Sequence, residues 1–207
     1  HRGDIVSTCS TDTHLQCKYH GRKFDLDGKC KSALGFDSNV GFPSSEDDLI
    51  EVDSKIWNGL IFCSLHPSSY LDQVFDIIGN YSDYIALDSI KYNATSSQVH
   101  EIDANWLLYC ENYLEGLHVP FVHSGLNKEI DMKSYTVKLF DNCILQTAMT
   151  RDVSLTFNKF KENQNEDLYP YALYFFIFPN IMINIYPWGV SMNIIEPISV
   201  KKTRIRF

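Results

Sequence analysis

Residues 105–123 constrain the chain most, because they combine a helical apolar pattern with two histidines and a proline. Apolar side chains recur every three or four residues up to about His118, which predicts a helix with one buried stripe. Pro120 is expected to end or kink this helix just after His118, since proline lacks a backbone donor and clashes with the preceding turn. A kink there would bring His123 back toward His118. The predicted stripe consists of Trp106, Tyr109, Tyr113 and Leu117.

Polar residues occupy another face of the same predicted helix. Glu111, Glu115 and His118 follow one another at spacings of four and three residues, so they share one side. Paired imidazoles with nearby carboxylates would suit a metal ion. Histidines at a helix end are nevertheless more often ordinary core or surface residues, and a Glu near a His arises from helix spacing alone. The stretch by itself therefore leaves a metal site and a structural pair open.

The composition excludes some classes of function. The chain has 207 residues and is 44% hydrophobic, which suffices for one or two packed domains. Its net charge is -8 and its basic residues cluster only in 201–206, so no nucleic-acid partner is expected. The longest apolar run, 169–186, is interrupted by prolines and asparagines. It therefore predicts a strand, a turn and a strand, and no membrane span.

The six cysteines are dispersed along the chain, without the density of a small disulfide scaffold. We therefore expect a reducing, cytoplasmic compartment. Cys30 and Cys63 lie in strand-like patterns and are expected to be small buried residues. The chain opens with His1 rather than Met, so we expect its natural beginning to be missing.

Residues 1–70 predict a small β domain whose loops carry metal-binding residue types. Asp27 and Gly28 mark a hairpin turn, because this dipeptide readily takes the positive φ values of a tight turn. Two further strands are expected at 49–52 and 56–63, joined at 53–55.

A connecting region and a second domain are expected to follow. Residues 71–100 contain a short amphipathic piece at 71–78 within a polar context. Residues 101–207 contain segments of alternating polar and apolar residues, which predict a curved antiparallel sheet. A polar stretch at 152–167 reads as a connection that forms a lid or lacks order. The alternating segments are 134–146, 181–185 and 191–195.

Two motifs in these regions resemble iron-binding motifs that occur together in one protein family. The opening His-Arg-Gly, followed by Cys17-x-x-His20-Gly, resembles the cluster-binding half of a Rieske iron-sulfur protein, whose pattern is Cys-x-His and then Cys-x-x-His. His118-x4-His123, with the preceding Asn-Trp and Glu-Asn-Tyr-Leu-Glu, resembles the mononuclear iron motif of the Rieske non-heme iron oxygenases. These are the large subunits of aromatic ring-hydroxylating systems. Together and in this order the two motifs are specific. The resemblance covers most of the chain, because residues 172–184 also resemble the strand pair that closes the substrate pocket in this family.

The resemblance implies an α+β fold. A small all-β Rieske domain would precede a helix-grip catalytic domain with a curved antiparallel sheet. The expected domains are 1–70, truncated at its N-terminus, a connecting region 71–100, and a catalytic domain 101–207, truncated at its C-terminus. The chain would therefore be a fragment.

The resemblance also implies two iron cofactors. A [2Fe-2S] cluster would be held by Cys17 on one iron and by His1 and His20 on the other, with the remaining Cys expected two positions before His1. A mononuclear Fe(II) would be held by His118 and His123, leaving other positions open for oxygen and substrate. The family's third ligand, an Asp, is expected beyond this chain. The aspartates present here lie too early, in loop-like contexts: Asp141, Asp152 and Asp167.

Two residues near His118 are implied to support it. Glu115 takes the place of the carboxylate that links the cluster to the iron site, and would accept hydrogen bonds from His118 and from His20 of a neighbouring subunit. Such head-to-tail contacts close into a ring, and the resemblance implies that this ring is a homotrimer. Asn112 is expected to line the iron pocket or to hold the helix. Aromatic residues at 174–178 would either shape a substrate pocket or belong to the core.

The implied activity is insertion of oxygen from O2 into a small organic substrate. Electrons would pass from NAD(P)H through a ferredoxin or flavin reductase to the cluster and then to the mononuclear iron. The sequence around 109–121 is similar to enzymes of the choline monooxygenase type as well as to aromatic-ring enzymes, so quaternary amines and aromatic acids both stay open as substrates. A hypothesis of another class is a non-catalytic electron-transfer or zinc-binding module. Its tetrahedral zinc ligands would be His1, Cys9, Cys17 and His20.

Overall fold

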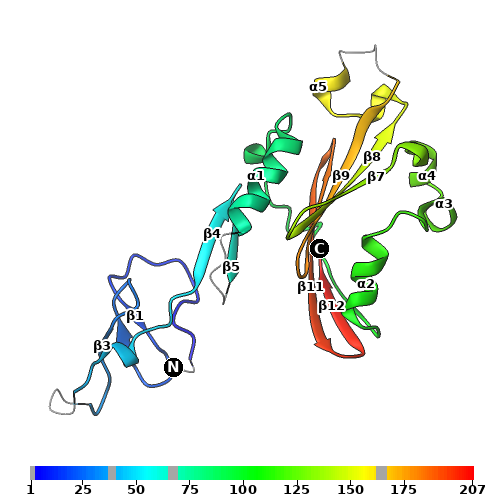
Figure 1. The fold of residues 1–207 in the computed structure, drawn as a ribbon. Helices are drawn as coiled ribbons and strands as arrows, with labels where there is room; N and C mark the ends of the chain where they lie inside the picture. The colour runs from blue at the N-terminus through cyan, green and yellow to red at the C-terminus, as the bar shows by residue number, and fades with distance from the viewer. Residues whose placement is uncertain (1–2, 37–40, 65–69, 162–166) are drawn as a thin grey trace. The chain divides into compact units, whose positions relative to one another are not determined.

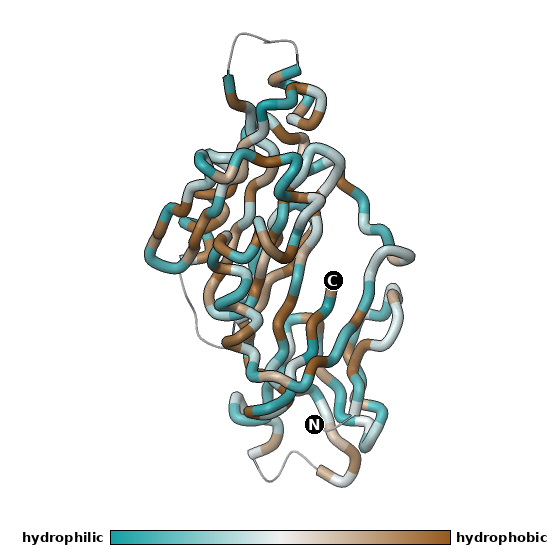
Figure 2. Tube along the Cα trace, turned by 90° about the vertical axis from the view of Figure 1, so that its right-hand side faces the viewer, coloured by the Kyte–Doolittle hydropathy of each residue, from teal (hydrophilic) through white to brown (hydrophobic). Residues whose placement is uncertain are grey.

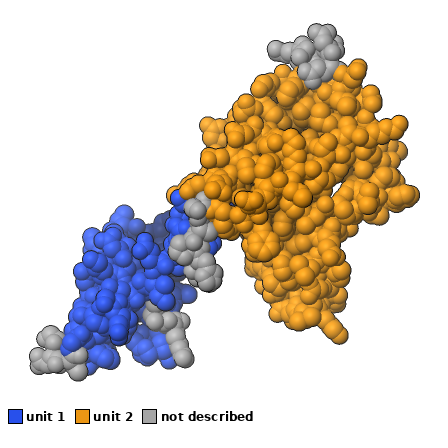
Figure 3. Space-filling view, in the orientation of Figure 1, with its two compact units in different colours: residues 1–55, 61–68 blue, residues 56–60, 69–207 orange. Residues whose placement is uncertain are grey.

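The computed structural model describes residues 3–36, 41–64, 70–161 and 167–207. The chain divides into two compact units, which Figure 3 distinguishes by colour. The first unit comprises 1–55 and 61–68, and the second comprises 56–60 and 69–207. The residues expected to form a connecting region, 71–100, thus belong to the second unit.

The first unit is built on short antiparallel strands. Its three-stranded sheet has the order β1-β2-β3. The loop from β2 to β3 turns at Gly28, whose φ of 85° favours a residue without a Cβ, so the predicted Asp-Gly turn is confirmed. Phe24, Cys17 and Cys30 are buried in this unit. The strands are β1 (Leu15–Gln16), β2 (Lys23–Phe24) and β3 (Cys30–Ser32), and a 3-10 turn, η2 (Ser45–Asp47), follows them.

A second hairpin consists of β4 (Asp53–Trp57) and β5 (Leu60–Ser64). It turns at Asn58 and Gly59, whose φ values are 46° and 78°. Asn and Gly adopt such values readily in two-residue hairpin turns. Residues 53–55 belong to the strand β4, so the turn predicted there is wrong. Cys63 was expected to be buried but is exposed, because it lies on the opposite face of β5 from the buried Phe62.

The second unit contains a seven-stranded sheet with the order β6-β12-β11-β10-β9-β8-β7. Neighbouring strands pair antiparallel throughout, which confirms the predicted antiparallel sheet and the α+β class. The predicted strand, turn and strand of 169–186 are β9 and β10. The strands are β6 (Val99–Ile102), β7 (Thr136–Leu139), β8 (Cys143–Thr150), β9 (Tyr169–Ile177), β10 (Ile181–Tyr186), β11 (Gly189–Ser199) and β12 (Lys202–Arg206).

Helices lie on both sides of this sheet. In Figure 1, α1 lies on one side of the strands, and α2, α3 and α4 lie on the other. No helix in the described ranges is long and apolar enough to cross a lipid bilayer. The helices are α1 (Tyr70–Ser82), α2 (Trp106–Tyr113), α3 (Val119–Val122), α4 (Leu126–Glu129) and α5 (Asn158–Lys161), with 3-10 turns η3 (Leu87–Ser89), η4 (Met132–Ser134) and η5 (Val153–Leu155).

Both faces of the central strands are buried, which explains their long apolar runs. Figure 2 colours the chain trace by hydropathy, and many of its inner segments are brown. The cross-strand partners Ile144, Phe176 and Met182 lie on the face toward α2 and pack against its Cys110. The opposite face is formed by Leu145, Leu173, Phe175, Ile183 and Ile185, each no more than 2% exposed.

Helix α2 begins as predicted but ends earlier. The Asn105 side chain accepts a hydrogen bond from Leu107 N at 3.0 Å and caps the helix start. The helix stops at Tyr113 instead of near His118, so Leu117 is 81% exposed and does not belong to the buried stripe. Pro120 does not end a helix. It lies in the first turn of α3, where a missing N–H leaves no hydrogen bond unmade.

Most of the basic run near the end of the chain lies on the strand β12, where its side chains are at least partly solvated. On β12, Lys202 and Arg204 both form ion pairs with Glu101 of β6, and Arg206 pairs with Glu196 of β11. Hydrogen bonds from Lys202 and Arg204 lower the pKa of Glu101 to about 2. These cationic groups are therefore partnered within the sheet.

Substitution Phe175→Ala tests the packing of the sheet. Phe175 is 0% exposed in the central strand β9, so truncation should lower the free energy of unfolding by about 3–5 kcal/mol. Phe178→Ala, at a ring that is 58% exposed just after the same strand, should change it by less than about 0.5 kcal/mol. Urea denaturation measures both values. Equal effects of the two variants would contradict this assignment of the core.

Candidate functional site

The break between α2 and α3 positions the candidate site. Beyond Tyr113 the backbone leaves the helix, and His118 becomes the N-cap residue of the four-residue helix α3. The carboxylate of Glu115 organises the turn: its Oε2 accepts hydrogen bonds from Leu117 N and, at 3.2 Å, from His118 N. Its Oε1 contacts His118 Nδ1. Glu115 therefore fixes both the backbone and the imidazole of His118.

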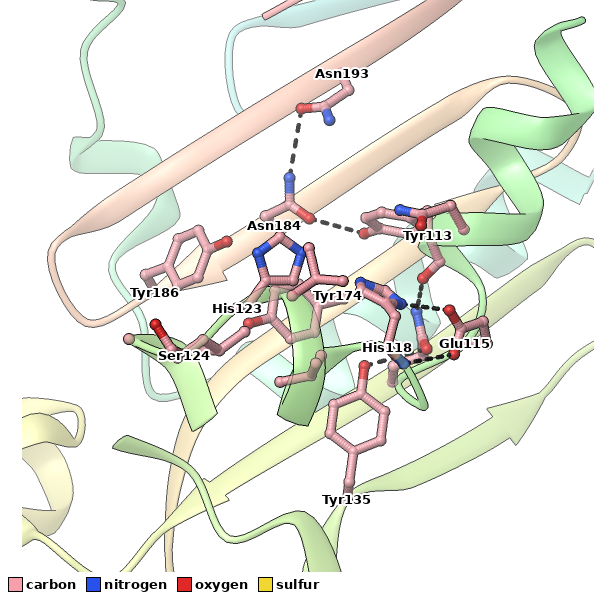
Figure 4. Close-up of a pocket in the computed structure, with 16 residues that line it drawn as sticks. Tyr113, Glu115, His118, His123, Ser124, Tyr135, Tyr174, Asn184, Tyr186 and Asn193 are labelled. Carbon is pink, nitrogen blue, oxygen red and sulfur yellow. Dashed lines mark hydrogen bonds and ion pairs between the residues drawn. The ribbon is translucent and has the colours of Figure 1, made fainter. Parts of the chain in front are cut away.

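The two histidines converge, as predicted. Their ring centroids are 5.0 Å apart, and the ring planes are inclined by 72°. His118 caps one end of α3 and His123 caps the other, so a single short helix sets their separation. Figure 4 shows both imidazoles beside the polar side chains of the sheet. The predicted convergence is correct, but its cause is this short helix rather than a kink in a long one.

A cavity of about 570 Å3 opens beside the two imidazoles. The residues that line it come from the break, from α3 and α4, and from the inner face of the sheet. Asn112, predicted to lie at the pocket, is among them, whereas Glu111 is not. The lining consists of Asn112, Tyr113, Glu115, His118, Val119, Val122, His123, Ser124, Gly125, Leu126, Tyr135, Gln146, Tyr174, Asn184, Tyr186 and Asn193.

A row of polar residues crosses four strands, and three of its four members, Gln146, Tyr174 and Asn184, line the cavity. Gln146, Tyr174, Asn184 and Ser191 are successive cross-strand partners on β8, β9, β10 and β11, and we call them the polar row. Because cross-strand partners share one face of a sheet, all four point toward the break. Asn184 Oδ1 accepts from Tyr113 Oη at 2.8 Å, and Asn184 Nδ2 donates to Ser191 Oγ at 3.0 Å.

The cavity is mostly neutral. Burial raises the pKa of Tyr135 to about 12 and raises those of Tyr113, Tyr174 and Tyr186, so these hydroxyls stay protonated at neutral pH. Among the described lining residues, Glu115 is the one carboxylate. The hydrogen bond with His118 holds the pKa of that carboxyl below its ordinary value. Glu115 is therefore ionised and already engaged.

The geometry suits His118 and His123 as metal ligands. A carboxylate at Nδ1 fixes the proton on that nitrogen, which leaves the Nε2 lone pair of His118 available to a metal. The donor set therefore fits the two-histidine part of a non-heme iron centre. Within the described ranges, no cluster of three or more His, Cys, Asp or Glu side chains is placed to hold a metal. Any further ligand has to come from elsewhere.

The first unit contains the remaining candidate metal ligands, and two of them lie close together. Cys17 is buried at 2% exposure, and Gly21 N donates to its carbonyl at 2.9 Å, so Cys17 and His20 lie on one tight loop. A Cβ at Gly3 would come within 3.2 Å of Cys17 Sγ, so the chain that follows His1 passes against this loop. His1 itself lies outside the described residues. Cys9, the further candidate for zinc, is exposed.

Several residues at the site had not been singled out from the sequence. Gln146, Asn184 and Tyr135 belong to the lining, and Tyr174 was left undecided between pocket and core. The available signal was a polar side chain at an inward position of an apolar strand, as in Ile-Met-Ile-Asn-Ile around Asn184. Phe178 is 58% exposed and does not line the cavity.

The antiparallel sheet with a broken helix across it, and paired histidines at the break, defines the catalytic domain of a ring-hydroxylating oxygenase. Residues 89–207 match the family model of the ring hydroxylating alpha subunit catalytic domain, and the chain belongs to that family.

Known proteins agree with this assignment. The chain is 25% identical to chloroplastic choline monooxygenase of Arabidopsis thaliana over 219 residues, covering 100% of the chain and 50% of that protein. It is 23% identical to the carnitine monooxygenase oxygenase subunit of Acinetobacter pittii over 184 residues, covering 87% and 48%. The crystal structure of the quaternary ammonium Rieske monooxygenase CntA with an inhibitor matches with a TM-score of 0.75 at 20% identity, covering 100% and 55%. The chain thus spans about half the length of the curated relatives it matches.

Substitution Gly116→Ala tests the packing of the break. A Cβ at Gly116 would lie 3.0 Å from Tyr135 Cε1, so the turn or the ring must move. We expect a loss of about 1–3 kcal/mol in the free energy of unfolding. Gly125→Ala is the matched control, because nothing lies within 4 Å of its Cβ and its φ of -66° is helical. Thermal denaturation that ranks Gly125→Ala as the more damaging change would refute this packing.

Proposed function

We propose that the whole protein is an oxygenase that inserts oxygen from O2 into a small organic substrate at a mononuclear iron held by His118 and His123. The observation that carries this proposal is the imidazole pair beside a cavity, with Glu115 fixing the orientation of one ring. Bound Fe(II) would supply the site at which O2 is reduced. Membership of the ring hydroxylating family supports the same activity.

In this proposal the residues around the metal orient its histidine ligand and exclude water. Glu115 accepts a hydrogen bond from His118 Nδ1 and fixes the orientation of the ring, which leaves Nε2 available to the metal. Asn112 presents a polar side chain at the cavity wall. Val119 and Val122 add apolar surface that displaces water. The described donors supply part of the iron coordination, and a carboxylate from elsewhere in the full-length protein would complete it.

The first unit is proposed to carry the electron donor. Cys17 and His20 would bind a [2Fe-2S] cluster together with His1 and one further thiolate. The buried thiol and its tight loop support this assignment, as does the approach of the chain near Gly3. This proposed Rieske domain is 1–70, and the proposed connecting region 71–100 and catalytic domain 101–207 both fall in the second unit.

The proposed partners follow from the assignment of the cluster to the first unit and of the mononuclear iron to the second. Electrons would come from NAD(P)H through a ferredoxin or flavin reductase. Electrons would pass from the cluster to the mononuclear iron across a link in which Glu115 accepts a hydrogen bond from His20 of a neighbouring subunit, as in a ring such as a homotrimer.

The substrate class we favour is a small aliphatic amine, in particular a quaternary ammonium compound. Tyr174 and Tyr186 line the cavity, and Tyr174 meets Tyr186 edge-on at 5.8 Å between centroids. Trp188, which is not part of the lining, stacks on Tyr186 at 4.8 Å. Ring faces attract such cations without needing a free carboxylate, and Glu115 is engaged by His118. The relatives named for choline and carnitine support this class over aromatic acids.

Metal analysis of the full-length protein tests the oxygenase. His118→Ala and His123→Ala should each weaken mononuclear iron binding by more than about 100-fold while the cluster iron is retained. His100→Ala is the control, because His100 lies in the same unit, does not line the cavity and bonds to Gln98 through a ring nitrogen. This variant should retain both the mononuclear iron and the cluster iron. Elemental analysis and electron paramagnetic resonance measure these metals. Zinc alone, with no iron signal that depends on His118, would instead support the non-catalytic or zinc-binding module.

Ligand binding tests the substrate class. Tyr186→Leu should weaken choline binding by about 10-fold, because the ring face is lost, whereas Tyr186→Phe should preserve it. The neutral isostere 3,3-dimethylbutan-1-ol should bind more weakly than choline and respond less to Tyr186→Leu. Isothermal titration calorimetry gives the dissociation constants. Tighter binding of benzoate than of choline would reject the amine class in favour of aromatic acids.

A further inference from the structure

The last residue of α2 is held at both of its ends by the polar row. Gln146 Nε2 donates to the main-chain carbonyl of Tyr113 at 2.7 Å, and the Tyr113 hydroxyl donates to Asn184 Oδ1 at 2.8 Å. Gln146 is 1% exposed and Asn184 is 6% exposed, so both contacts lie away from solvent. Tyr113 is therefore fixed against β8 and β10, two strands of the sheet that are separated by β9.

The hydrogen bond to the Tyr113 carbonyl compensates for the early end of the helix. The last carbonyls of a helix have no partner within it, and a buried carbonyl without a donor is costly. Continuation of α2 would give Tyr113 O a partner from residue 117, but Leu117 N donates to Glu115 instead. Gln146 supplies the missing donor. The sheet thus favours a break at this residue over a longer helix.

Tyr135 connects the same glutamine to the turn that follows. Its hydroxyl donates to Gln146 Oε1 at 3.1 Å, which orients the amide so that Nε2 faces Tyr113. Its ring lies against Gly116, where an added Cβ would meet Cζ at 3.2 Å. Gln146 and Tyr135 together therefore fix the backbone on both sides of Glu115.

We infer that Gln146 is a positioning residue for the metal site, acting through the end of α2 and the turn that carries Glu115 and His118. Only four residues separate Tyr113 from His118, and Glu115 spans part of that distance with its hydrogen bonds to Leu117 N and His118 N. A displaced Tyr113 carbonyl moves this turn, and with it the imidazole of His118 relative to His123. The inference rests on the proposed function, in which these two histidines bind the metal.

The test uses Co(II) as a spectroscopic probe in the full-length protein, with the mononuclear metal removed and the cluster left intact. Gln146→Met keeps the length of the side chain and removes its hydrogen bonds. We expect about 10-fold weaker Co(II) binding and altered visible absorption bands. Tyr135→Phe removes only the hydroxyl and leaves the ring against Gly116, so it should change both readouts in the same direction by a smaller amount.

A matched control separates positioning from general stability. Thr203 is 0% exposed, and its hydroxyl donates to Ala104 O at 2.8 Å, before the start of α2 and away from the break. Thr203→Val also deletes one buried hydrogen bond and should lower the melting temperature, but it should leave the Co(II) affinity and spectrum as in the wild type.

Each outcome decides the question. Weaker binding in Gln146→Met, or in Tyr135→Phe should the first variant not fold, together with an unchanged Thr203→Val, supports the inference. Wild-type affinity and spectrum in the glutamine and tyrosine variants, or an equal change in Thr203→Val, overturns it. If the unmodified protein binds no Co(II), or if His118→Ala leaves Co(II) binding unchanged, the proposed function itself fails, and the inference falls with it.

Discussion

The hydrogen bond between the side chain of Gln146 and the last carbonyl of α2 is the constraint on which the site depends. The apolar spacing continues to Leu117, and although Gly116 is a local stop signal, the spacing alone does not place the end of the helix at Tyr113. A donor from the sheet at 2.7 Å stabilises the broken form, since it satisfies a carbonyl that would otherwise be buried without a partner. The break then permits the turn at Glu115 and the short helix whose two ends carry His118 and His123.

Hydrogen bonds within the polar row and to α2 explain how buried amide side chains are accommodated in an apolar core. Buried amides destabilise a protein by about 1–3 kcal/mol each when their hydrogen bonds are unmade. Here the Asn184 side chain accepts from Tyr113 and donates to Ser191, and Gln146 both donates and accepts. Next to this row, Ile144, Phe176 and Met182 form apolar packing with α2. One sheet face therefore has an apolar region that holds the helix and a polar region that ends it.

The same arrangement accounts for the character of the cavity. The hydroxyls of Tyr113 and Tyr135 are used as donors to the sheet, and the carboxylate of Glu115 is used by His118. What the described walls present to a ligand is thus the rings of Tyr174 and Tyr186 and the amides of Asn112 and Asn193, beside two imidazoles.

The sequence by itself determined the residue types and their order: paired histidines, Glu115 three residues before the first of them, and strands whose apolar runs predict a sheet. Such local patterns are readable because periodicity and turn chemistry depend on near neighbours. The Asp-Gly turn at Gly28 was predicted on that basis, and the hairpin at Asn58 and Gly59 carried an equally clear signal that was assigned wrongly.

Only the tertiary structure decided where α2 ends and which polar side chains reach the site. The end of the helix depends on Gln146, which lies 33 residues away in sequence, and the polar row depends on the register of four strands. Neither is encoded in local spacing, because a hydrogen bond between distant segments forms only once the sheet has set their positions. That long-range contact overrides the local helical pattern and places the two imidazoles together.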